Sequence, residues 1–138
     1  MPIQYSVPLR NNQLDQIETT TGASARLRLF SGAPPANCAA ASTGTLLVDM
    51  ALPADWMAAA SAGSKARLGT WSGVGTAGAG TGTVAGYFRI FDSAGTTCHM
   101  QGNVTITGGG GDMQLDNPNI APNQVVTVNT FNITAGNA

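Results

Sequence analysis

Charged residues are scarce in this sequence, and their scarcity argues against partners that are bound through charge. The 138 residues include six Lys and Arg and seven Asp and Glu, or 9% charged residues, against roughly 25% in an average globular protein. Binding to nucleic acid needs clustered cations that displace counterions from phosphates, and a formal net charge of -1 offers no such field. We therefore expect no direct nucleic-acid partner.

Long apolar runs are also missing. No run approaches the roughly 20 residues that a helix needs to cross a bilayer. The segment from Met1 to Arg10 lacks the basic and then apolar plan of a signal peptide. The sequence therefore predicts no membrane partner and a chain that starts in the cytoplasm.

Cysteine and histidine are nearly absent. Cys38 and Cys98 are too few for a disulfide framework, and a reducing compartment favours free thiols, so whether the two pair stays open. His99 follows Cys98 directly, but neighbouring residues in a strand point to opposite faces, which argues against a catalytic cysteine and histidine pair. A closed zinc site needs four ligands. We expect a buried thiol beside an outward imidazole.

The glycine-rich segments match functional motifs only in part. Gly73, Gly75 and Gly78 have the spacing of a dinucleotide-binding fingerprint, but more Gly and Thr follow where that motif needs a helix. Asp112 and Asp116 border a glycine run without the further oxygen ligands of a calcium loop. No P-loop, zinc-protease or serine-hydrolase motif occurs. The sequence therefore predicts no enzyme, with no catalytic residue, no cofactor site and no metal site.

The residues that are present indicate one folded domain. Hydrophobic residues make up 43% of the chain, too many for a disordered segment of such low net charge. Ser6–Glu18 has a helical period that places Leu14 and Ile17 on one face, and the threonine run that follows is expected to break the helix. We interpret residues 1–24 as an N-terminal arm with a short helix, a docking tether outside the core, and residues 25–138 as a β-sandwich domain.

The rest of the chain has the period of two that is typical of β-strands. Val84–Asp92 is apolar on both faces, so we expect a central strand that is covered on both sides. The predicted fold class is mainly β, an antiparallel β-sandwich or a jelly-roll-like single domain. The expected strands are Ala25–Phe30, Leu46–Leu52, Lys65–Trp71, Val84–Asp92, Cys98–Thr107, Met113–Leu115 and Gln124–Thr134.

The segments between these strands are predicted from their composition. Ser31–Thr45 and Ser72–Thr83 are expected to be loops, because they are rich in Pro, Gly and small residues. The alanines of Ala54–Ala62 predict a second helix, ended by Gly63. The apolar phase of the last strand slips between Val128 and Phe131, which predicts a bulge or a bend.

Large apolar side chains are divided between core and surface. Phe88, Ile90 and Phe131 are assigned to the core. Trp56 and Trp71 lie beside loops, and tryptophan is enriched at protein interfaces. The candidate interface residues are Leu14, Ile17, Trp56, Trp71, Tyr87 and Phe91.

Several segments together resemble small virion proteins of tailed bacteriophages and prophages. They are Tyr5-Ser6, Arg10-Asn11, Leu14-Asp15 with Ile17-Glu18, Phe88–Asp92, His99–Gly102 and Gly109–Asn117.

The resemblance implies a structural role, with head decoration (cement) protein as the preferred class. It implies the major capsid protein and copies of the chain itself as partners, and a location in the virion after assembly in the host cytoplasm. The alternatives are a tail, neck or fibre-associated module of the same particle, or a carbohydrate-binding β-sandwich with Trp56 beside Asp55 as its sugar platform.

Overall fold

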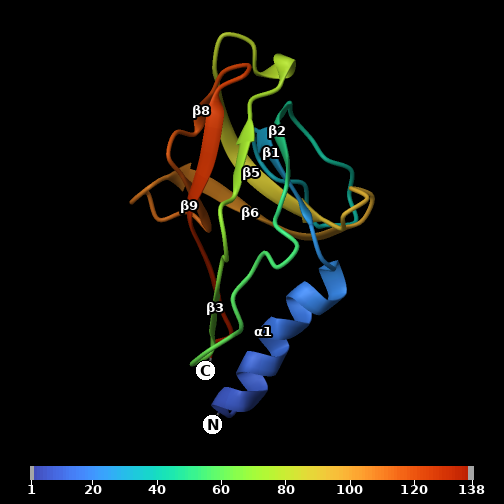
Figure 1. Cartoon of the computed structure of the whole chain (residues 1–138), viewed down its shortest axis with the longest axis vertical. Helices are drawn as coiled ribbons and strands as arrows, with labels where there is room; N and C mark the ends of the chain where they lie inside the picture. The colour runs from blue at the N-terminus through green and yellow to red at the C-terminus, as the bar shows by residue number, and fades with distance from the viewer. Residues whose placement is uncertain (1, 137–138) are drawn as a thin grey trace.

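The computed structural model describes residues 2–136 and consists of one helix beside a strongly curled β-sheet (Figure 1). The prediction of a mainly β single domain with an N-terminal helix is confirmed. The elements are α1 (Val7–Thr21), β1 (Arg26–Ser31), β2 (Leu46–Ala51), β3 (Ser64–Ala66), β4 (Ser72–Val74), η1 (Ala77–Ala79), β5 (Thr83–Phe91), β6 (Cys98–Ile106), β7 (Met113–Leu115), β8 (Asn119–Ile120) and β9 (Val125–Thr134).

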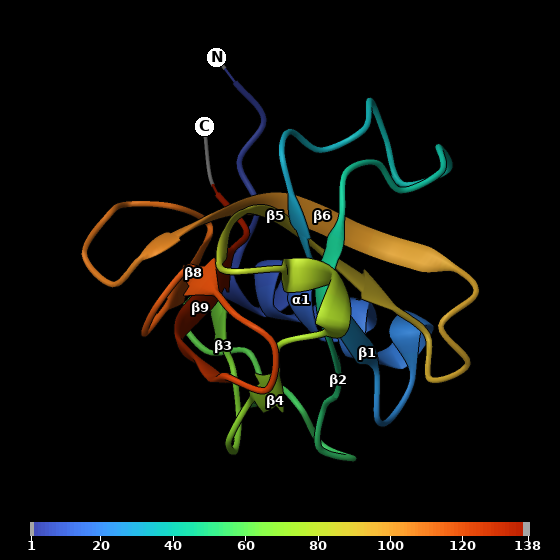
Figure 2. The same cartoon turned by 90° about the horizontal axis from the view of Figure 1, so that it is seen from above.

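The strands form one mixed sheet in the order β2-β1-β5-β6-β7-β9-β3, while β4 also pairs with β9 and β8 pairs with β5. The β6–β7 pair is parallel, and the other strand pairs are antiparallel. The sheet curls until β4 meets β2, where Val48 and Gly75 form a single bridge. Seen from above, the strands surround the interior (Figure 2). The architecture is therefore a half-barrel, close to the expected sandwich.

The helix is longer than predicted. Ser6 caps it, because the Ser6 hydroxyl accepts a hydrogen bond from the backbone N–H of Leu9, and Pro8 fits the first turn. The helix continues through the threonine run and ends at Gly22, whose positive φ of 89° suits glycine. The expectation that the threonines break the helix was wrong, since Thr21 packs into the protein and is buried.

The α1 helix is part of the folded body rather than a tether outside it. It runs beside β3 and the end of β9 (Figure 1). The Leu14 side chain is buried, and the Arg10 Nε donates to the Ala135 carbonyl at 2.6 Å. The Asn11 side-chain oxygen accepts from the N–H of Gly63 at 2.8 Å. Residues 2–24 therefore do not form a separate arm, because the helix is bonded to the residues just before β3 and just after β9.

The central position of β5 agrees with the sequence-based expectation. It pairs with β1 along one edge and with β6 along the other. Phe88 and Ile90 are buried on the inner face, in the main hydrophobic core. Tyr87 and Arg89 are buried on the outer face, beneath the loop of residues 32–45. Both faces of the strand are thus covered by the chain's own residues.

The predicted helix at Ala54–Ala62 is absent. This segment instead runs back along residues 64–67, with bridges from Met57 to Arg67 and from Ser61 to Ser64. Ala62 and Gly63 both have positive φ, 52° and 74°, as a tight hairpin turn requires. Tertiary contacts therefore override the helix propensity of the alanines, and Gly63 forms a turn rather than a helix cap.

The glycine segment Ser72–Thr83 is not a plain loop. It contains β4 and the short helical turn η1. A Cβ atom on Gly73 would lie 2.8 Å from the Met50 Cβ, and one on Gly75 would lie 2.0 Å from the Ala121 carbonyl oxygen. The glycines let neighbouring chains approach closely where the sheet closes, so the expectation of an unpacked loop was wrong.

The predicted bulge in the last strand is confirmed. Gln114 of β7 pairs with Thr130, whereas Leu115 pairs with Val128, which leaves Asn129 as the extra residue. The bulge lets β9 turn Val128 and Phe131 into the same core.

Candidate functional site

Five of the six candidate interface residues are buried within this chain. Leu14, Tyr87 and Phe91 have little exposed surface, and the exposed fraction of both Trp56 and Trp71 is 0%. Ile17 is half-buried and packs against the core. The structure distributes the six over both faces of the sheet and over the helix, and it does not gather them into one surface.

The expectation that the two tryptophans are surface anchors needs correction. The Trp56 indole N–H donates to the Gly22 carbonyl at 2.9 Å, and the Trp71 N–H is shared between the carbonyls of Trp56 and Leu68. Because each indole finds a carbonyl inside, its burial leaves no unpaired donor. The Trp71 ring packs at a tilt against the rings of Trp56 and Phe131, with centroids 5.9 and 5.4 Å apart. With Trp56 in this cluster, the expected sugar platform is not on the surface.

Tyr87 and Phe91 are covered from outside by residues of the same chain. The Tyr87 hydroxyl accepts from the Thr43 N–H and donates to the Thr43 carbonyl. Arg28 lies over the Phe91 ring, with its guanidinium carbon 4.7 Å from the ring centre. These contacts explain why the outer face of β5 needs no partner subunit to exclude water.

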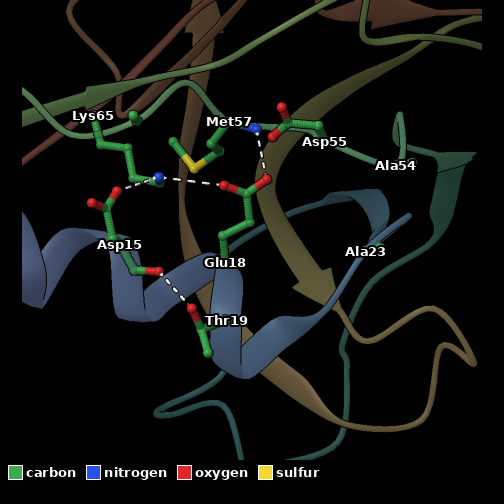
Figure 3. Close-up of a pocket in the computed structure, with 9 residues that line it drawn as sticks. Asp15, Glu18, Thr19, Ala23, Ala54, Asp55, Met57 and Lys65 are labelled. Atoms are coloured by element: carbon green, nitrogen blue, oxygen red, sulfur yellow. Dashed lines mark hydrogen bonds and ion pairs between the residues drawn. The ribbon is translucent and has the colours of Figure 1, made fainter.

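A hollow lies between α1 and the hairpin that leads to β3 (Figure 3). It is an open groove of about 460 Å³. Its charged groups come from the helix and from the hairpin, and they face one another in the close-up. The lining residues are Asp15, Glu18, Thr19, Ala23, Ala54, Asp55, Met57, Ala59 and Lys65.

Lys65 is the central cation of this groove. Its side chain is 2% exposed, and its Nζ lies 2.8 Å from the Asp15 Oδ1, 3.3 Å from the Glu18 Oε2 and 2.9 Å from the Ala58 carbonyl. These three acceptors match the three protons of an ammonium group. Lys65 therefore links β3 to the helix through its ion pairs, and its amino group is not a free nucleophile.

The carboxylates of the groove also bind backbone. The Glu18 Oε1 accepts from the N–H groups of Trp56 and Met57 at 3.0 and 3.1 Å. Asp15 accepts from the Ala60 N–H at 2.9 Å. The hydrogen bond from Lys65, and then that from Ala60, lowers the pKa of Asp15 below its usual value. The groups of this groove are thus engaged in holding the hairpin to the helix.

A second polar cluster lies on the outer face, where Arg89 holds the loop of residues 32–45. Arg89 is buried, and its terminal nitrogens donate to the carbonyls of Asn37, Cys38 and Ala40 and to the Ser42 hydroxyl, at 2.8 to 3.2 Å. These partners are neutral oxygens, so hydrogen bonds to them, and not an ion pair with a carboxylate among them, compensate the burial of the terminal nitrogens.

Gln101 continues this cluster on β6, directly opposite Arg89 in the strand register. Its amide nitrogen donates to the Pro35 carbonyl at 2.8 Å. The sequence reasoning missed Arg89, Gln101 and Lys65. A signal for Arg89 was nevertheless present, because a cation inside an apolar strand needs an internal partner.

The remaining candidates take structural positions. His99 is exposed, while the neighbouring Cys98 thiol is half-buried. The Asp112 carboxylate accepts from the Asn103 N–H, and that of Asp116 accepts from the N–H groups of Asn117 and Thr127. Within residues 2–136 no group of three His, Cys, Asp or Glu side chains could hold a metal ion.

The N-terminal segment presents apolar side chains to solvent. Residues 2–6 are not part of a helix or strand and lead into α1 at one end of the molecule (Figure 1). The exposed fraction of Ile3 is 74%. The exposed apolar residues of this segment and of the first helical turn are Ile3, Tyr5, Val7 and Leu9, and we call them the N-terminal apolar patch.

Comparison with known protein families, curated proteins and solved structures finds no match for this chain. No helix in residues 2–136 is both long enough and apolar enough to span a bilayer.

Proposed function

We propose that this chain is a structural virion protein of a tailed bacteriophage, a head decoration protein that binds the outer capsid shell. Its partners in this proposal are the major capsid protein and copies of itself. The observation that carries it is the N-terminal apolar patch on an otherwise compact β-domain. Apolar side chains that stay exposed at one end of a folded chain favour a site of contact with another protein.

The charge of the chain supports the same proposal. Many copies of a decoration protein lie side by side on one particle, where a high net charge would make them repel one another. A formal net charge of -1 keeps such repulsion small. Weak contacts repeated over a shell can then add up through multivalency.

Shell binding by variants of the patch tests the proposal. Ile3→Asp combined with Leu9→Asp should lower binding to purified shells at least tenfold, because each change places a charge in an apolar contact. The thermal unfolding midpoint should stay within about 2 °C, since both side chains are exposed. Val84→Asp is a matched control, because Val84 is exposed but lies on β5, outside the patch. Equal shell binding by the wild-type chain, the double variant and Val84→Asp would contradict the proposal.

The number of copies in purified particles separates the head assignment from a tail, neck or fibre-associated module. Hundreds of copies per particle, measured by quantitative mass spectrometry, support the shell. A handful of copies would favour the tail. Absence from particles would overturn both assignments.

A further inference from the structure

The two cysteines of this chain come together in the fold, although they are sixty positions apart in a sequence with no other cysteine. Cys98 begins β6, where it pairs with Phe91 of β5 on the outer face of the sheet. Cys38 lies in the loop of residues 32–45, which covers that same face.

Arg89 fixes the two positions relative to each other. Its Nη2 donates to the Cys38 carbonyl at 2.8 Å, and its guanidinium carbon lies 5.6 Å from the centre of the Phe91 ring. One buried side chain therefore contacts both the backbone of the first cysteine and the strand partner of the second.

The two thiols lie close enough to interact. Both cysteines are half-buried and carry free thiols. Burial, and then a hydrogen bond with the Cys38 thiol, raises the pKa of Cys98, while the nearby Arg89 opposes this shift. The Cys98 Sγ also lies 3.4 Å from the Met100 carbonyl oxygen.

We infer that Cys38 and Cys98 are a site of oxidative modification, where an intrachain disulfide forms and fastens the loop of residues 32–45 to β6. The co-reactant is a low-molecular-weight disulfide. One cysteine thiolate attacks it, displaces one of its thiols and leaves a mixed disulfide on the protein. The second thiolate then attacks the protein sulfur of that bond and releases the other thiol. One protein S–S bond forms, two protein S–H bonds are lost, and the co-reactant is reduced to two thiols.

The surroundings suit such a bond. Residues 32–45 lie outside the strands, so a shift of Cys38 to a bonded geometry need not break the hydrogen bonds between strands. Glutathione and thioredoxin systems keep such a pair reduced in a cytoplasm. An oxidising medium outside a cell would close it. The loop would then be held by hydrogen bonds to Arg89 during synthesis and by a covalent bond afterwards.

Mass spectrometry of the full chain tests the inference. The protein is fully reduced, freed of reductant and incubated with oxidised glutathione at pH 8, because thiol–disulfide exchange is faster in mildly alkaline solution. We expect the monomer to lose the mass of two hydrogen atoms, both free thiols to disappear, and a peptide map to link Cys38 with Cys98. The melting midpoint should rise by on the order of 10 °C, because the bond closes a long loop.

The single variants Cys38→Ser and Cys98→Ser provide the control. In each variant, oxidation should leave the melting midpoint unchanged, and one glutathione adduct should remain on the other cysteine. The mass of the wild-type chain decides the question even if a variant folds poorly. Two persistent glutathione adducts, a disulfide-linked dimer, or two thiols that survive oxidation would each overturn the inference.

Discussion

At the scale of single residues, Arg89 shows how one cation can organise a loop. Its neighbours in β5 are apolar, and Arg89 is buried with them. Four neutral oxygens of residues 37–42 accept hydrogen bonds from its terminal nitrogens. The fit is incomplete, because the Arg89 Nε and the Gln101 Oε1 are buried without a hydrogen-bond partner. Such atoms cost about 1 to 3 kcal/mol each, so we expect this loop to open before the sheet does.

Arg89→Ala should lower the free energy of unfolding by about 3 to 5 kcal/mol, because it leaves several partly buried carbonyls without donors and removes a buried side chain. Urea unfolding measures this loss, and hydrogen exchange should become faster in residues 32–45. Arg67→Ala is a matched control, since the Arg67 bonds to the carbonyls of Gly69 and Asn129 are exposed. We expect a loss of about 0.5 kcal/mol there. Equal losses in the two variants would refute the assigned role.

At the scale of elements, the contact of α1 with β3 depends on a charge cluster, so it should depend on pH. The folded protein lowers the pKa of Asp15. A carboxyl group of this kind contributes stability above its unfolded pKa of about 3.9, and loses that contribution as the pH falls through the lower folded value. The Asp15 side chain is 44% exposed, so solvent screens the ion pair with Lys65.

Asp15→Asn should therefore lower the free energy of unfolding by roughly 1 kcal/mol at pH 7, and the difference from wild type should shrink as the pH falls below about 4. Urea unfolding between pH 7 and pH 2 measures it. Asp55→Asn removes a carboxylate from the same groove without touching either Lys65 ion pair. A pH-independent difference for Asp15→Asn would contradict the explanation.

Local signals were enough to predict most elements but not their partners. Alternation found β1, the run that is apolar on both faces found β5, and the phase slip found the bulge at Asn129, because these patterns follow from strand geometry. The prediction of a helix in the alanine-rich segment before Gly63 was wrong, because Glu18, which is far away in the sequence, binds the backbone of that segment. The buried cations Lys65 and Arg89 were missed for the same reason: their partners lie far away in the chain.

At the scale of the whole molecule, residues 2–18 belong to the folding unit. Removing them would expose the core around Leu14 and would leave Lys65 buried without its two carboxylates. An unpaired buried charge costs several kcal/mol, a large share of the roughly 5 to 15 kcal/mol available to a domain.

A chain without Met1–Glu18 should therefore lose cooperative unfolding, or melt at least about 10 °C below the full chain. Near-ultraviolet circular dichroism and calorimetry measure this. A chain without residues 1–3 is the control, since it keeps the Ser6 cap and removes the exposed Ile3. If the longer deletion unfolds like the full chain, the helix is an appendage, as the sequence had suggested.

The position of β9 in the sheet bears on how the protein is made. This strand pairs with β3, β4 and β7, and the residue just after it receives the hydrogen bond from Arg10. A ribosome delivers residues 125–135 after every one of those partners, so the half-barrel cannot close while they remain in the exit tunnel. Until then the nascent chain exposes the edges of β3, β4 and β7 together with the apolar side chains that β9 will cover. Such a chain folds late rather than segment by segment, and its yield in cells should depend on the chaperones that protect it during that interval.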